Sequence, residues 1–470
     1  MRQRAAGYVC INGSAMEMVL EFLRDVLSQP ALLIGIMSCI GLIALKRPFH
    51  KVMTGTLKPI LGYLMLAAGA GVIVNNLDPL GKMIEHGFHI TGVVPNNEAI
   101  VAVAQKVLGV ETMSILVVGL LMNLCIARFT KFKYVFLTGH HSLFMACLMS
   151  AVLGTAGLSG MELILVGGFL MGAWSAISPA IGQSYTSKVT EGDEIAIGHF
   201  GSLGYYLSAW VAKYVGKADD STEDIEIPEK WGFLRDSTLS TALTMIVFYL
   251  IAAFAAGSEF VATLSGDMSP YLYAVMSAMN FAVGVTIVYS GVRMILGDLI
   301  PAFQGIATKI IPNAIPAVDC AVFFTYAPTA VVLGFISSFI GGIIGMLILG
   351  AVGGVLIIPG LVPHFFCGAT AGIYGNATGG RRGAAVGAFL NGLAITFLPA
   401  LALPVLGQLG FQNTTFGDAD FAVMGLVLGH AFEWIGMAGI YGIVAIAALV
   451  LIIPNFIKTK GKVINYVEEE

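Results

Sequence analysis

Residues 316–358 read PAVDCAVFFTYAPTAVVLGFISSFIGGIIGMLILGAVGGVLII, and the only charged residue in this stretch is Asp319. An α-helix needs about 20 mostly apolar residues to cross the hydrocarbon core of a bilayer. The stretch is long enough for two crossings, which we place at 316–335 and 337–358. It therefore predicts a helical membrane protein. A transmembrane barrel is disfavoured, because barrels are built from short segments of alternating hydrophobicity.

The rest of the 470-residue chain has the same character. Hydrophobic residues make up 57% of it and charged residues only 11%, against roughly 25% charged residues in soluble domains. This composition argues against a soluble enzyme. The chain has 24 Lys and Arg and 28 Asp and Glu, and the basic residues form no stripe, which argues against a nucleic-acid binder. Further apolar runs bring the predicted spans to about eleven. They lie near 29–45, 52–75, 113–129, 134–157, 160–180, 238–263, 271–292, 382–408 and 437–454.

The positions of the basic residues predict how the chain is oriented. Positive charge concentrates in cytoplasmic loops. Clusters lie at Lys46-Arg47, at Arg128–Lys133 and at Lys458–Lys462. Two predicted spans separate the first two clusters, and the third follows the last span, so we expect a cytoplasmic C-terminus. No cleavable signal is predicted, because no apolar segment follows the first basic residues.

The chain divides around one long acidic connection. We predict a first membrane repeat, a polar linker, a second membrane repeat, a short polar loop with a final helix, and a cytoplasmic tail. Their bounds are 16–215, 216–237, 238–408, 409–456 and 457–470, and residues 1–15 would be an extension if the chain starts at Met16. The linker is either a solvated connection or a docking surface for a soluble partner.

A short internal similarity supports two repeats. Lys58–Leu64 and Arg293–Leu299 share the pattern basic-x-Ile-Leu-Gly-x-Leu. Many transporters are built from internal repeats with broken helices that meet at a midplane binding site. The sequence therefore favours a transporter.

Polar residues interrupt the apolar sequence in four places. They are Asn97 and Glu98; His140, His141, Ser142, Leu143 and Phe144; His199 and Phe200; and Asp319. Ionisable groups in membrane segments are costly and are functional candidates. Imidazoles, carboxylates and an amide together donate and accept hydrogen bonds, as a hydroxyl-rich ligand requires.

Each group also has a simpler interpretation. The histidines can belong to helix ends near the interface. Asp319 can cap the N-terminus of its span, and Asn97 and Glu98 can begin a helix in a loop.

Other chemistry finds little support in the sequence. Gly81-Lys82 is not followed by the Ser or Thr of a phosphate-binding loop. His140-His141 lacks the ligand spacing of a zinc site, and the six cysteines form no CxxC pair. We therefore predict no metal and no cofactor.

With these residues the chain resembles the membrane component, enzyme IIC, of the phosphoenolpyruvate-dependent sugar phosphotransferase system (PTS), of the ascorbate-specific type. The resemblance runs from about Met16 to Pro454. The motifs that carry it are Leu137–His140, Ile197–His199, Ile311-Pro312 with Val318–Cys320, Ile357–Gly360, and Gly379-Gly380 with Arg382.

The resemblance implies an all-α polytopic fold of two inverted five-helix repeats plus an extra helix, with re-entrant or broken helices. It also implies a homodimer in which a substrate-carrying core domain moves like an elevator against a scaffold domain. The substrate contacts would fall on the ten residues named above for the four polar interruptions of the apolar sequence. Phe144 and Phe200 stand where the best-known member has glutamines, and Asn97 and Glu98 stand where it has threonine and tyrosine.

The implied function is a permease of the bacterial inner membrane that takes up L-ascorbate or a related acidic polyol. This subunit is expected to be non-catalytic, because a cytosolic IIB component carries the phosphate on its own cysteine and works with a IIA component. The alternative is an ion-coupled secondary transporter that uses Asp319 and the histidines as proton sites. A membrane scaffold or receptor is disfavoured by the polar residues inside apolar segments.

Overall fold

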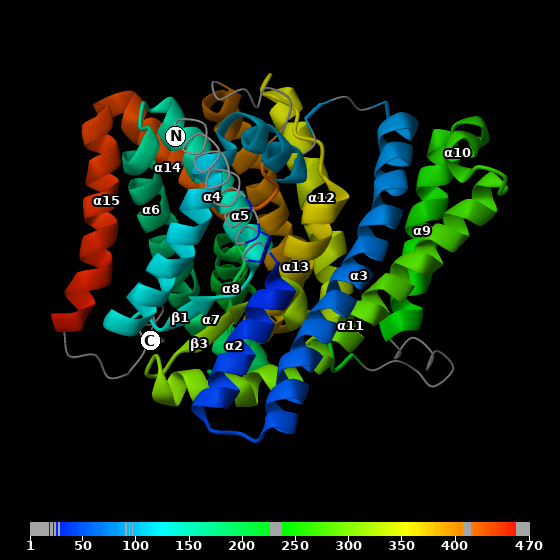
Figure 1. Cartoon of the computed structure of the whole chain (residues 1–470). Coiled ribbons are helices and arrows are strands. Elements are labelled where there is room, and N and C mark those ends of the chain that lie inside the picture. Colours follow the sequence, from blue (N-terminus) through cyan, green and yellow to red (C-terminus); the bar gives the residue numbers. More distant parts are fainter. Residues whose placement is uncertain are drawn as a thin grey trace, which may run out of the picture.

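In the computed structural model, the described residues are 29–89, 92–93, 95, 97–225, 237–407 and 415–456, with four isolated positions before residue 29. Residues 1–15, 409–414 and 457–470 of the predicted domain layout lie outside them. Within the described part of the chain, seven helices are long and apolar enough to cross a membrane, or eight if α9 and α10 form one bent span. The protein is a helical multi-pass membrane protein (Figure 1). The finer count of about eleven spans stays a prediction.

The described residues form helices and three very short strands. The helices are α2 (Pro30–Ala44), α3 (Phe49–Gly87), α4 (Asn97–Phe129), α5 (Gly139–Thr155), α6 (Gly160–Ile181), α7 (Gln183–Thr190), α8 (Ser202–Val215), α9 (Ser237–Ala256), α10 (Ser258–Ser265), α11 (Pro270–Lys309), α12 (Pro328–Ala351), α13 (Leu361–Gly407), α14 (Ala419–Ile435) and α15 (Met437–Ile452), with 3-10 helices η2 (Cys320–Thr325) and η3 (Ile453–Phe456). The strands are β1 (Tyr134–Phe136), β2 (Ala196–Ile197) and β3 (Ile315–Val318).

The three strands form a parallel sheet in the order β1-β3-β2. Phe136 pairs with Ala317, and Ile197 pairs with Val318. Every strand residue is buried. A parallel strand covered on both faces reads as a continuous apolar run, which hydrophobic periodicity does not separate from a buried helix. For this reason the predicted helical spans at 134–157 and 316–335 include β1 and most of β3.

The predicted crossings at 316–335 and 337–358 differ from the structure. A strand and a 3-10 helix occupy 315–325, and α12 alone crosses afterwards. Pro328 lies in the first turn of α12, where the N–H group that proline lacks would have no partner within the helix. Proline also disfavours a helical conformation at the residue before it, so α12 begins here and does not continue from η2.

The first half of α13 was also absent from the predicted spans. The helix breaks at Gly379 and Gly380, and Gly380 has a φ of 60°, a conformation that glycine adopts at little cost. A Cβ atom at Gly375 would lie 2.4 Å from the carbonyl oxygen of Gly383. The two halves therefore fold back against each other.

Helices α3 and α11 lie side by side in backbone contact (Figure 1). A Cβ atom at Gly62 would lie 2.9 Å from the carbonyl oxygen of Gly291, and one at Gly69 would lie 2.7 Å from that of Gly284. Small residues allow this close approach of membrane helices. The two similar heptapeptides belong to these helices, and Lys58 pairs with Asp298 across them at 3.7 Å. The full repeats, 16–215 and 238–408, stay a prediction.

The first part of the acidic linker packs against the helices. The Glu223 carboxylate accepts hydrogen bonds from the backbone N–H groups of Thr329 (3.0 Å) and Ala330 (3.1 Å), at the N-terminus of α12. Asp220 pairs with Arg381 at 2.6 Å, next to the break in α13. Six of the nine residues 217–225 are nevertheless exposed, so the interpretation as a solvated connection stays a prediction, and 226–236 lie outside the described residues.

We predict that Gly198→Ala disrupts the sheet. A Cβ atom at Gly198 would lie 2.4 Å from the carbonyl oxygen of Ala317, so β2 and β3 would have to separate. We expect the variant to lose about 1–3 kcal/mol of stability, the typical cost of overpacking, measured by thermal unfolding in detergent. Gly71→Ala is the matched control, because nothing lies within 4 Å of its new Cβ. Equal melting temperatures in the two variants would contradict the prediction.

Candidate functional site

Three of the predicted site residues come within four residues of the ends of the three strands. His140 follows β1, His199 follows β2, and Asp319 follows β3. The strands are parallel, so their carboxyl ends meet at one edge of the sheet, where ligands bind in sheets of this kind. Asp319 ends the central strand, and its Oδ2 lies 3.4 Å from Nε2 of His140. The sheet thus brings together residues up to 179 positions apart (319 − 140).

Asp319 has two roles in this arrangement. Its Oδ1 accepts a hydrogen bond from the backbone N–H of Ala321 (3.2 Å) and so caps η2. The interpretation of Asp319 as an N-cap is therefore confirmed, although the element it caps is a 3-10 helix. The other oxygen faces His140. One carboxylate can fix the local backbone and still present an acceptor.

Two further imidazoles are fixed by backbone hydrogen bonds. The N–H of Phe200 donates to Nδ1 of His141 (3.3 Å), and the N–H of Gly201 donates to Nδ1 of His199 (3.2 Å). A nitrogen that accepts a hydrogen bond carries no proton, so each neutral ring carries its proton on Nε2. The ring centroids lie 3.8 Å apart. The pair therefore offers two N–H donors side by side.

Asn97 holds the loop that precedes α14. Its Nδ2 donates to Oδ2 of Asp418 (2.5 Å), and its Oδ1 accepts from the N–H of Gly417 (2.9 Å). The Sγ of Cys367 donates to the other oxygen of Asp418 (2.8 Å). These bonds join the starts of α4, α13 and α14 around one buried carboxylate.

Asp420 caps α8 from a different helix. It accepts hydrogen bonds from Ser202 Oγ (2.8 Å), from the N–H of Leu203 (3.0 Å) and from Trp174 Nε1 (3.2 Å). Sequence reasoning missed both Asp418 and Asp420. In the sequence they are a pair of carboxylates just before an apolar run, and the same pattern is typical of an ordinary helix N-terminus.

A cavity of about 750 Å³ lies between α3 and the carboxyl edge of the sheet. The predicted residues that line it are Asn97, His140, His141, Phe144, His199 and Asp319. Along α3 it extends from Tyr63 to the exposed pair Asp78 and Lys82. The cavity thus joins the buried polar cluster to the far end of α3.

The remaining predicted residues lie elsewhere. Ser142 and Leu143 are not in the cavity lining, and Ser142 Oγ donates to the carbonyl oxygen of Thr138 (3.3 Å). Phe200 is fully buried and stacks on Phe136, with centroids 4.6 Å apart. Glu98 lies in α4, and its side chain lies outside the described residues.

Comparison with known proteins identifies the family of the chain. Residues 25–420 match the family described as EIIC-GAT, the PTS system sugar-specific permease component. The chain belongs to this family.

A curated relative of this permease component is the ascorbate-specific PTS system EIIC component of Mycoplasma pneumoniae. It is 28% identical over 417 residues, which cover 76% of this chain. The chain spans 62% of the length of that relative. The family resemblance found in the sequence is confirmed.

Several helix N-termini lie beside the cavity. Its lining includes first-turn residues of α4, α5, η2 and α13, and Asp418, which precedes α14. The N-terminus of a helix carries a partial positive charge and unpaired N–H groups, so it favours anions. Broken helices in transporters direct such ends at anionic groups of the substrate. The helix ends therefore favour an anion, although the lining also holds four carboxylates, Asp78, Glu85, Asp319 and Asp418, against one lysine, Lys82.

The same residues include two sets of possible metal ligands. Donor atoms of His199, Asp319 and Cys320 lie within 4.8 Å of one another, as do those of His199, Cys367 and Asp418. All five residues are buried. Sequence spacing did not indicate either set, because each combines ligands from separate parts of the chain.

Proposed function

We propose that this permease component binds L-ascorbate or a related acidic polyol in the cavity and carries it across the bacterial inner membrane. The observation that carries the proposal is the convergence of His140, His199 and Asp319 at one sheet edge. It is supported by the ascorbate-specific name of the relative from Mycoplasma pneumoniae.

The donors and acceptors fit such a ligand. Ascorbate at neutral pH is an anion with several hydroxyl groups, and each hydroxyl both donates and accepts. Asp319 supplies the acceptor, the two Nε2–H groups of His141 and His199 supply donors, and the helix N-termini stabilise the negative charge. Phe144 provides an apolar wall against a ring face.

The transport step follows from where the cavity lies. One wall is α3, which packs tightly with α11, and the other wall consists of the sheet edge and the helices around it. We propose that α2, α3, α9, α10 and α11 belong to a scaffold, and that the sheet-bearing part is the core that moves against it. In a homodimer, contacts between the two scaffolds would keep the scaffolds fixed while each core moves.

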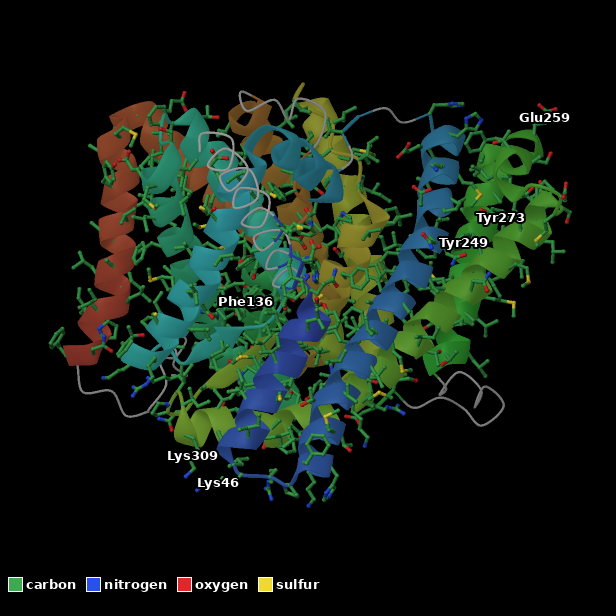
Figure 2. All side chains as sticks on the ribbon, viewed as in Figure 1. Lys46, Phe136, Tyr249, Glu259, Tyr273 and Lys309 are labelled. Atoms are coloured by element: carbon green, nitrogen blue, oxygen red, sulfur yellow. The ribbon has the colours of Figure 1, made fainter. Side chains whose placement is uncertain are left out.

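The direction of opening supports an outward-facing state. Lys46 and Lys309 lie at one end of the molecule and Glu259 lies at the other (Figure 2). Basic residues favour the cytoplasmic side. The cavity extends along α3 away from the end that bears Lys46, toward Lys82. The C-terminal helix α15 ends on the basic side (Figure 1), which supports a cytoplasmic tail.

We further propose that the substrate is phosphorylated after it reaches the cytoplasmic side. The donor would be the phosphocysteine of a IIB partner, charged in turn by IIA. The thiols near the cavity, Cys320 and Cys367, are buried, so neither is placed to exchange phosphate with a soluble protein. The rival function, ion-coupled transport, would use the His140–Asp319 pair as its proton site.

Uptake is predicted to depend on phospho-IIB and not on a proton gradient. We would measure uptake of radiolabelled L-ascorbate into vesicles with and without purified phospho-IIB, with and without a protonophore. We expect accumulation only with phospho-IIB, and no loss on adding the protonophore. Accumulation without IIB that collapses with the protonophore would favour the ion-coupled transporter.

His199→Ala should weaken L-ascorbate binding more than it weakens folding. The variant loses one hydrogen-bond donor in the cavity, which typically costs about 0.5–3 kcal/mol. His364→Ala is a matched control, because His364 is a buried histidine that bonds to Ser338 (2.9 Å) outside the cavity lining. We expect the control to lose stability and to keep its affinity for ascorbate. Equal affinities in His199→Ala and the parent would contradict the role of His199.

Phe144 and Phe200 should respond differently to glutamine. Phe144 lines the cavity, whereas Phe200 is stacked inside the core. We expect Phe144→Gln to raise ascorbate affinity by adding a hydrogen-bonding amide. Phe200→Gln should instead lower the melting temperature, because it buries an amide without a partner. The pair of variants serves as its own control, and an ascorbate affinity that stays flat or falls in a folded Phe144→Gln would contradict the prediction.

A further inference from the structure

The thiol of Cys320 has no part in the hydrogen bonding proposed for the substrate. Cys320 is the first residue of η2, directly after Asp319, and only 1% of its surface is exposed. It nevertheless lines the cavity, as do Asp319 and His199. Nitrogen, oxygen and sulfur donors within 4.8 Å of one another form a combination that transition metals bind.

The second donor set is closed to a metal from the cavity. Cys367 already donates to one oxygen of Asp418, and the other oxygen accepts from Asn97. Cys367 is fully buried and is not part of the cavity lining. Of the two sets, only His199, Asp319 and Cys320 open together onto the cavity.

A fourth candidate ligand, His140, lies beside Asp319 but outside the set of donors that lie within 4.8 Å of one another. His140 is partly exposed, and its Nε2 lies 3.4 Å from Oδ2 of Asp319. Two imidazoles, one carboxylate and one thiolate are ligands that zinc accepts in a tetrahedral site. The ion would have to draw these donors together, because zinc bonds are about 2.0–2.3 Å long.

The surroundings of His199 can support the metal-bound form. A metal at Nε2 requires the ring proton to move to Nδ1, which gives up the hydrogen bond that Nδ1 accepts from the N–H of Gly201. Tyr205 Oη lies 2.8 Å from Nδ1 and can accept a hydrogen bond from the Nδ1–H group. Metal-bound histidines usually donate their other N–H to such an acceptor. The same shift removes the Nε2–H donor that the substrate would use.

Charge balance also favours a divalent ion. Binding converts the Cys320 thiol to a thiolate and releases one proton to the solvent. The thiolate and the Asp319 carboxylate together then neutralise a 2+ ion. An ion cluster with no net charge is cheaper to hold in a buried cavity than an unpaired charge.

We propose that His199, Asp319, Cys320 and His140 bind a borderline-soft divalent transition-metal ion, of which Zn²⁺ is the test case, and that the bound ion excludes the substrate. The metal site stands on the geometry alone. The exclusion of substrate rests on the proposed function, because both ligands need the same face of His199.

The metal site is tested first, without any sugar. Purified full-length protein is titrated with Zn²⁺ by calorimetry, and with Co²⁺ by absorption, since a thiolate ligand gives cobalt a charge-transfer band. We expect one ion per chain and a thiolate band. Cys320→Ser should remove the band and weaken Zn²⁺ binding by at least tenfold. Cys125→Ser is the matched control, because Cys125 is an exposed thiol on α4.

Several results would overturn the site. One is a parent protein without the band, and another is a band that survives in Cys320→Ser. A band lost in Cys367→Ser but kept in Cys320→Ser would assign the metal to the closed set. Cys320→Ala is made alongside, and melting temperatures identify any variant that fails to fold, so that a folded replacement of Cys320 is compared with the parent.

The exclusion is tested second, by measuring L-ascorbate binding at rising Zn²⁺. We expect zinc to lower the apparent affinity of the parent at least tenfold, and to lower that of Cys320→Ser much less. Simultaneous binding of both ligands would overturn the exclusion. A parent that binds zinc through Cys320 but never binds ascorbate would contradict the proposed function and leave the metal site standing.

Discussion

The hydrogen bonds between β3 and its two neighbours are the interaction on which the site depends. Backbone groups inside a membrane protein must find partners within the protein, because lipid offers none. β3 meets this demand by pairing with β1 on one side and β2 on the other. The N–H of Leu137 donates to Ala317 (2.9 Å) and that of Gly198 donates to Val318 (2.7 Å), which extends the pairing past the strand ends. The register of the strands therefore sets the positions of the residues that follow them, including His140, His199 and Asp319.

The helices around the sheet are joined by caps that come from other parts of the chain. Asp420 of α14 caps α8, and Glu223 of the linker caps α12. A cap of this kind contributes about 0.5–2 kcal/mol. Because each one connects separate elements, it also ties the position of one helix to that of another. These contacts help the sheet-bearing part behave as one body.

The sequence was sufficient for the protein class, the family and six of the residues that line the cavity. The membrane fold followed from long apolar runs, and His140, His199 and Asp319 were found because charge is rare in such runs. The sheet was not predictable, since strands of two to four buried residues show no alternation. Without the sheet, Phe200 looked equivalent to Phe144. Asp418 was missed because a carboxylate before a helix usually serves only as a cap.

Tyr63 of α3 faces Asp319 from the opposite wall of the cavity, and this has a thermodynamic consequence. A ligand shifts a conformational equilibrium only by its difference in affinity for the two states. The groups at the sheet edge would travel with the ligand, so their hydrogen bonds are the same in both states and cancel. Only contacts with the α3 wall, such as that of Tyr63, can differ. In the proposed elevator motion, the residues that bind the cargo most strongly would therefore not be those through which it biases the movement.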